Sequence, residues 1–153
     1  MGEPIRVEIR RSLGSHLAGA SIPRRLILLD AAVFARRGEF ERILIHELFH
    51  FVWLRAGNPR RRSWESLLKA ELAVHARGEL GWSAEWRKKT LRAGDIAGRT
   101  RRWREYCCES FCDTAAWLYS DVRRHPEFAL AAQFRAPRRI WFGEAIGKRE
   151  LPV

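Results

Sequence analysis

The chain has 153 residues, of which 46% are apolar, and it contains 8 Phe and 7 Trp residues. This length is typical of a single domain, residues 1–153, and the apolar content excludes a chain that is disordered throughout. The 29 Lys and Arg residues outnumber the 18 Asp and Glu residues, and the formal net charge of +11 favours acidic partners such as nucleic acid. Charged residues interrupt every apolar stretch, so the sequence predicts no membrane span, which needs roughly 20 apolar residues.

The N-terminal part of the chain predicts a small sheet. Ile5, Val7 and Ile9 alternate with charged residues, which is the pattern of a half-buried strand. A second strand is expected at residues 26–29, a short run of apolar side chains. Asp30 follows this run and is placed to cap a brief helix directly after it.

The remainder of the chain predicts helices, expected at residues 39–56, 63–77, 83–94 and 100–124. The first of them has the strongest pattern, with acidic residues in its first turn and an arginine in its last, as the helix dipole favours. Residues 140–142 are expected to form a docking segment or a short strand. The predicted fold class is therefore α+β, mainly helical, with a small N-terminal sheet.

His46, Glu47 and His50 form the pattern H-E-x-x-H in the middle of the strongest predicted helix. Positions i and i+4 differ by about 40° around a helix, so both imidazoles project from one face and can bind one Zn²⁺. Glu47 is rotated by roughly 100° from His46 and is expected beside the metal, where it can take a proton from a bound water. The alternative is a pair of core histidines hydrogen-bonded to carboxylates or carbonyls.

A catalytic zinc site usually has three protein ligands and an open position, so a third ligand is expected from elsewhere in the chain. The best candidate is Glu109, at the centre of a polar stripe on the last predicted helix. Asp113 follows one turn later and is placed to hold the outer ring nitrogen of a ligand histidine. Glu71, His75 and Glu105 are the other candidates for the third ligand.

The combination of H-E-x-x-H and E-x-x-x-D resembles the signature of the glutamate-zincins, zinc metallopeptidases whose third ligand is a glutamate on a later helix. The resemblance covers roughly residues 24–57 and 104–118. It implies a zincin-like domain with an active-site helix, the metal ligands His46, His50 and Glu109, the general base Glu47 and the supporting carboxylate Asp113. The sequence does not continue as H-E-x-x-H-x-x-G-x-x-H, which excludes the metzincin branch.

These residues predict a zinc-dependent metallopeptidase that acts on a peptide or protein substrate. Tyr106 and His75 are candidate donors to the oxyanion of the reaction. The strand at residues 26–29 is expected to offer an edge on which an extended peptide adds as a further strand.

Two other functions are compatible with the sequence. One is a catalytically inactive zincin-like binding module. The other is a basic nucleic-acid-associated protein, because arginine-rich clusters with nearby tryptophans could give a weak association with nucleic acid. These clusters lie at residues 60–62, 87–89 and 99–104.

Cys107, Cys108 and Cys112 lie close together on the last predicted helix. Three cysteines on one helix cannot alone enclose a tetrahedral ion, so we expect small buried thiols near the site, with Cys112 on the face of Glu109. An odd, clustered set of cysteines is also a poor disulfide framework. A reducing, cytoplasmic setting is therefore expected.

Overall fold

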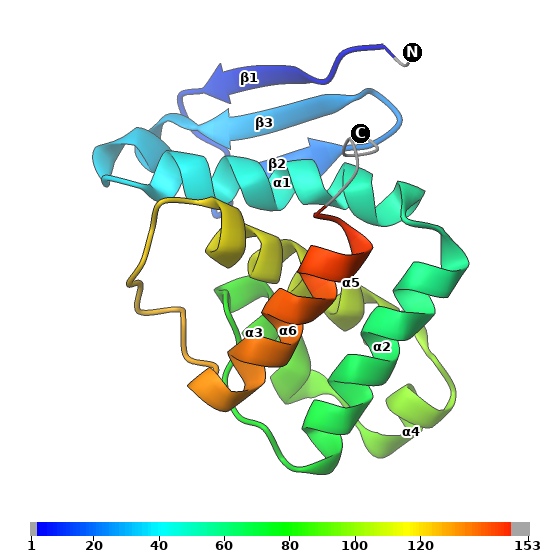
Figure 1. The fold of residues 1–153 in the computed structure, drawn as a ribbon. Helices are drawn as coiled ribbons and strands as arrows, with labels where there is room; N and C mark the ends of the chain where they lie inside the picture. The colour runs from blue at the N-terminus through cyan, green and yellow to red at the C-terminus, as the bar shows by residue number, and fades with distance from the viewer. Residues whose placement is uncertain (1–2, 148–153) are drawn as a thin grey trace.

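The computed structural model describes residues 3–147, which form a small sheet and a larger group of helices (Figure 1). Figure 1 shows α1 lying between the sheet and the other helices, and this arrangement confirms the predicted α+β class. The elements in chain order are β1 (Arg6–Arg10), β2 (Ala18–Ser21), β3 (Leu26–Asp30), the 3-10 helix η1 (Ala31–Ala35), α1 (Glu39–Arg55), α2 (Gly57–Ala73), α3 (Trp82–Thr90), α4 (Ala93–Ala97), α5 (Arg101–Tyr119) and α6 (Ala132–Ala145).

The sheet has the strand order β1-β3-β2, with β3 parallel to β1 and antiparallel to β2. The predicted strand at residues 26–29 is present, but it is the central strand and has no free edge. The expectation that it receives a peptide is therefore wrong. Strand β2 is not apparent in the sequence, because its residues Ala-Gly-Ala-Ser show no alternation of apolar and polar side chains.

One face of the sheet packs against α1. Ile27 and Leu29 are fully buried there, in a cluster that includes Ile43 of α1. Val7 and Ile9 were expected to be half-buried, but they are 47% and 58% exposed. The reason is that α1 packs mainly on β2 and β3 and leaves the edge strand β1 uncovered.

Several helix boundaries differ from the predicted ones. The helix expected to begin at Ser63 begins at Gly57, whose positive φ of 77° turns the chain directly from α1 into α2. The helix expected at residues 83–94 divides into α3 and α4, and α5 already ends at Tyr119. Residues 140–142 belong to α6, so they form neither a strand nor an isolated docking segment.

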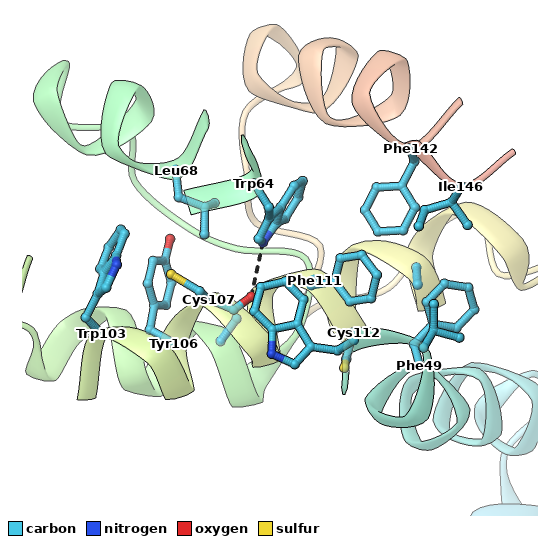
Figure 2. Packing of buried hydrophobic residues seen from close by; sticks show 14 residues of the cluster. Phe49, Trp64, Leu68, Trp103, Tyr106, Cys107, Phe111, Cys112, Phe142 and Ile146 are labelled. Atoms are coloured by element: carbon cyan, nitrogen blue, oxygen red, sulfur yellow. Dashed lines mark hydrogen bonds between the residues drawn. The ribbon is translucent and has the colours of Figure 1, made fainter. Parts of the chain in front are cut away.

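The main core is aromatic and fixes α5 against α1, α2 and α6 (Figure 2). Phe111 of α5 is fully buried at its centre. Its ring centroid lies 5.8 Å from that of Phe49, 5.1 Å from Trp53, 6.0 Å from Trp64 and 5.0 Å from Phe142. Aromatic pairs at such separations are favourable, so this cluster sets the position of α5 relative to the H-E-x-x-H helix.

A buried ionic network joins α6 to the rest of the helical part. Arg138 is fully buried and donates hydrogen bonds to Glu71 of α2 at 2.7 Å and to Glu79, before α3, at 2.8 Å. The Tyr106 hydroxyl of α5 donates to the same Glu79 at 2.6 Å. Because each charge has a partner, the network can stay buried, and it connects α2, α5, α6 and the segment before α3. Among the helices of residues 3–147, none has both the length and the apolar composition needed to cross a membrane.

Candidate metal centre

The packing of α1 on α5 brings His46, His50 and Glu109 together. Each residue offers one ligand atom, and these atoms all lie within 4.8 Å of one another. His46 Nε2 lies 3.2 Å from Glu109 Oε2, and His50 Nε2 lies 4.0 Å from Glu109 Oε1. The two imidazole rings have centroids 5.1 Å apart. The structure thus places the three predicted ligands around one point.

The outer nitrogen of each histidine is held by a side chain of α5. His46 Nδ1 lies 2.7 Å from Asp113 Oδ1, the partner that the sequence predicts. His50 Nδ1 lies 3.4 Å from Cys108 Sγ, a partner that it does not predict. With both Nδ1 atoms engaged in this way, both Nε2 atoms are directed to Glu109, which is the orientation that a shared cation needs.

Asp113 is itself fixed by the segment that leads into α3. Its Oδ2 accepts a hydrogen bond from the backbone N–H of Ala84 at 2.9 Å. Gly81 lies so close that a Cβ at this position would overlap the Asp113 carboxyl group. The carboxylate is therefore held between His46 and the start of α3, and this support depends on a glycine at position 81.

Charges in the site hold protons on the histidines and remove the proton from Glu109. Burial favours the neutral ring of His46, but Asp113, Glu109 and Glu47 outweigh it and raise the pKa of His46 well above its ordinary value. Burial also opposes ionisation of Glu109, yet the hydrogen bond from His46 and the charges of His46, His50 and Arg87 lower its pKa to about 2. A cation entering this site would therefore displace protons from the histidines and meet a Glu109 carboxylate that is already ionised.

Glu47 lies at the wall of a cavity beside these ligands. The cavity has a volume of about 520 Å³ and is bounded by strand β2 and helices α1 and α5. Glu47 is mostly buried, and burial raises the pKa of its carboxyl group although the charges of His46 and His50 act in the opposite direction. A carboxylate with a raised pKa beside a metal site is a good proton acceptor near neutral pH.

The other residues considered as ligands or donors lie outside this group. The prediction of Tyr106 as an oxyanion donor is wrong, because its ring is fully buried and its hydroxyl is committed to Glu79. Glu71 is paired with Arg138, and His75 is exposed beyond the C-terminal end of α2. Glu105 lines the cavity, but it pairs with Arg101 at 2.7 Å. Of the candidates for the third ligand, Glu109 is the one that groups with His46 and His50.

Two residues near the site have roles that the sequence does not predict. Arg87 of α3 places a guanidinium nitrogen 3.5 Å from Glu109 Oε1. In the sequence, Arg87 is visible only as one member of the basic cluster at residues 87–89. Cys108 lines the cavity and contacts His50, whereas Cys112 behind it is fully buried. The spacing of Cys108 and Cys112, one helical turn, is the signal that could have placed both thiols on the face toward α1.

Comparisons of the chain with protein-family models, with curated proteins and with solved structures find no match. The resemblance to the glutamate-zincins stays a prediction that rests on the H-E-x-x-H and E-x-x-x-D residues. A function in metal chemistry therefore depends on the geometry of these residues.

Proposed function

We propose that this protein is a zinc-dependent metallopeptidase of the glutamate-zincin type. The observation that supports this proposal best is the convergence of His46 Nε2, His50 Nε2 and the Glu109 carboxylate at a cavity wall that also carries Glu47. Two imidazoles and one carboxylate are an established ligand set for catalytic zinc. Zinc held there would lower the pKa of a water molecule and polarise the scissile carbonyl group.

The proton transfers of the reaction fall to Glu47. Its carboxylate would accept a proton from the attacking water and then deliver it to the leaving amine. Asp113 would keep the proton of His46 on Nδ1 and so keep Nε2 free for the metal. Hydrolysis of an amide bond needs each of these steps, and each has a residue in the site.

The substrate that suits this cavity is an extended peptide. Ala18, Gly19 and Ala20 of the edge strand β2 line the same cavity as Glu47. An edge strand offers unpaired backbone groups, and small side chains leave space for a second chain to pair with it. We therefore assign the peptide-binding edge to β2 in place of the central strand β3.

The experiment that tests this function compares the wild-type protein with Glu47→Gln. The zinc-loaded wild type is expected to cleave a mixture of unfolded polypeptides, and the cut sites are read by mass spectrometry. Glu47→Gln should retain one zinc per chain and lose at least about 100-fold in cleavage rate. Glu105→Gln is the matched control, because Glu105 lines the same cavity but pairs with an exposed arginine.

Two results would count against the proposal. Unchanged cleavage by Glu47→Gln would exclude Glu47 as the base. Zinc binding without any cleavage by the wild type would favour the alternative of a zincin-like binding module.

A second candidate function, binding of single-stranded nucleic acid, is favoured by the surface of α3. Trp82 and Trp86 are 62% and 52% exposed, and their rings are stacked with centroids 6.2 Å apart. Trp86 also borders a cavity of about 610 Å³ with a basic lining that includes Arg92 and Arg102. Aromatic faces beside a basic groove are suited to bases and phosphates.

This second function is tested with a labelled single-stranded oligonucleotide. Trp86→Ala should weaken binding about tenfold, since base stacking contributes about 1–3 kcal/mol per base. The affinity should also fall steeply with salt. An affinity that does not change with salt would exclude phosphate contacts.

We also propose a cytoplasmic setting. Cys107, Cys108 and Cys112 are free thiols in the structure. Reducing compartments keep such thiols unpaired, whereas oxidising ones favour disulfides.

A further inference from the structure

A second group of potential metal ligands lies on the other side of His50. Cys108 Sγ lies 3.4 Å from His50 Nδ1, and Cys112 follows one turn later on α5. One ligand atom from each of these three residues lies within 4.8 Å of the other two. Cys108 lines the open cavity, so an ion can reach the group through the same entrance as the substrate.

The spacing within this group suits an ion. An ion bound tetrahedrally at about 2.3 Å from sulfur and about 2.0 Å from nitrogen separates these two atoms by about 3.5 Å. The observed separation of 3.4 Å between Cys108 Sγ and His50 Nδ1 is close to this value. The two cysteines are four residues apart on a helix, which is the same spacing that directs His46 and His50 to one point.

We propose that His50, Cys108 and Cys112 form a second metal-binding set, which takes soft cations such as Cd²⁺ or Cu⁺. Thiolates favour soft metal ions, and they also bind zinc, whereas a carboxylate ligand such as Glu109 favours harder ions. Binding releases to solvent the protons of the two thiols and the proton on His50 Nδ1, and two thiolates and that nitrogen then bind the cation.

The two sets exclude each other because they share His50. A neutral imidazole has one nitrogen with a free lone pair, and the other nitrogen carries a proton. His50 can therefore serve the first set through Nε2 or the second through Nδ1, and it cannot serve both as a neutral ring. A soft cation would remove one ligand from the zinc centre. The binding of soft cations stands by itself, and only the resulting loss of peptide cleavage rests on the proposed function.

The test is a titration of the reduced, metal-free protein with Cd²⁺, followed by the ultraviolet charge-transfer absorbance of cadmium thiolates. The wild type is expected to bind one Cd²⁺ with this absorbance. His46→Ala cannot assemble the first set and should keep the absorbance unchanged. Cys108→Ser should lose most of it. Cys107→Ala is the matched control, because this third thiol is buried in the aromatic core and belongs to neither set.

The proposal is overturned if the wild type binds Cd²⁺ without thiolate absorbance, or if Cys108→Ser retains it in full. Cadmium-113 NMR of the wild type gives the same answer without a substitution, since its chemical shift reports the number of sulfur ligands. Two sulfur ligands support the set, and none or one contradicts it.

The exclusion of one set by the other needs a separate measurement. One equivalent of Cd²⁺ added to the zinc-loaded wild type should release one zinc ion, detected with a zinc-sensitive dye. Thiolate absorbance without zinc release would contradict the sharing of His50. A thiolate signal in His46→Ala would support the second set even where no peptide is cleaved, so the two proposals fail in different ways.

Discussion

The substitution Asp113→Asn tests how the proposed metal centre is held, because it keeps the shape of the side chain and changes only its hydrogen bonding. The two carboxylate oxygens of Asp113 engage two partners, His46 Nδ1 at 2.7 Å and the backbone N–H of Ala84 at 2.9 Å. Asparagine has one carbonyl oxygen and one amide group that only donates. One of the two partners must therefore face a donor.

The expected size of the effect follows from these two alternatives. If the amide group of the asparagine faces His46, it favours a proton on Nε2, the atom that must bind the metal. If it faces Ala84 instead, the backbone N–H of this residue loses its acceptor, and the side chain at position 113 is no longer held against the start of α3. Losing such a partner of a ligand histidine typically costs 10–100-fold in metal affinity, which is about 1.4–2.8 kcal/mol.

The assay is a competition titration with a zinc chelator, combined with thermal unfolding of the metal-free protein. Asp30→Asn is a closely matched control. Asp30 is also buried and accepts two backbone hydrogen bonds, from Leu13 at 2.7 Å and from Ala32 at 2.8 Å, but it contacts no histidine. Both variants should lose about 1–3 kcal/mol of stability, and only Asp113→Asn should lose zinc affinity.

One pattern of results would refute a role for Asp113 in metal binding. If Asp113→Asn binds zinc as tightly as Asp30→Asn does, while both unfold at similarly lowered temperatures, Asp113 serves only to fix the start of α3.

Three further predictions concern the surroundings of the site, its protons and the ionic network. Gly81→Ala should lower zinc affinity at least tenfold in the chelator titration, because the added Cβ would displace Asp113. Gly143→Ala is the control and should leave zinc affinity unchanged, because its Cβ meets no atom within 4 Å. Both ligand histidines have raised pKa values, so zinc must displace protons and its affinity should rise with pH near 7. Calorimetry in buffers of different ionisation enthalpy counts these protons, and a count of zero would contradict protonated histidines in the metal-free site. Arg138→Met leaves the buried Glu71 without its partner Arg138 and leaves Glu79 with Lys88 and Tyr106, so it should cost about 3–5 kcal/mol in urea denaturation. Arg139→Met, at an exposed position, should cost less than about 1 kcal/mol.

The parts of the site that sequence predicts are those set by the geometry of a single helix. The spacing of His46 and His50 places them on one face wherever the helix lies, and the same holds for Glu109 and Asp113. Which side of α5 turns toward α1 is fixed by the packing around Phe111, and the polar stripe of this helix indicates that side without fixing it. The sequence therefore predicts that these four residues lie together, as the structure shows, and it assigns a role to a buried tyrosine incorrectly.

The remaining features depend on contacts between distant segments. Gly81 and Ala84 meet Asp113 only because the start of α3 packs on α5. Strand β2 is stabilised by pairing with β3, and its small residues carry no periodic signal of their own. Because β2 is not predicted from the sequence, β3 is wrongly predicted to be an edge strand, whereas it is the central one. Val7 is a similar case. Its alternation with charged residues correctly predicts strand β1, but its exposure depends on which helices pack on that strand, and the alternation does not show this.

X-ray absorption at the zinc edge, on the reduced and zinc-loaded wild type, tests the proposed hydrolytic centre most directly. We expect one zinc per chain, surrounded only by nitrogen and oxygen at about 2.0–2.2 Å, from the two histidines, Glu109 and solvent. Sulfur scattering at about 2.3 Å would place zinc on Cys108 and Cys112 and would contradict the assignment of the hydrolytic centre.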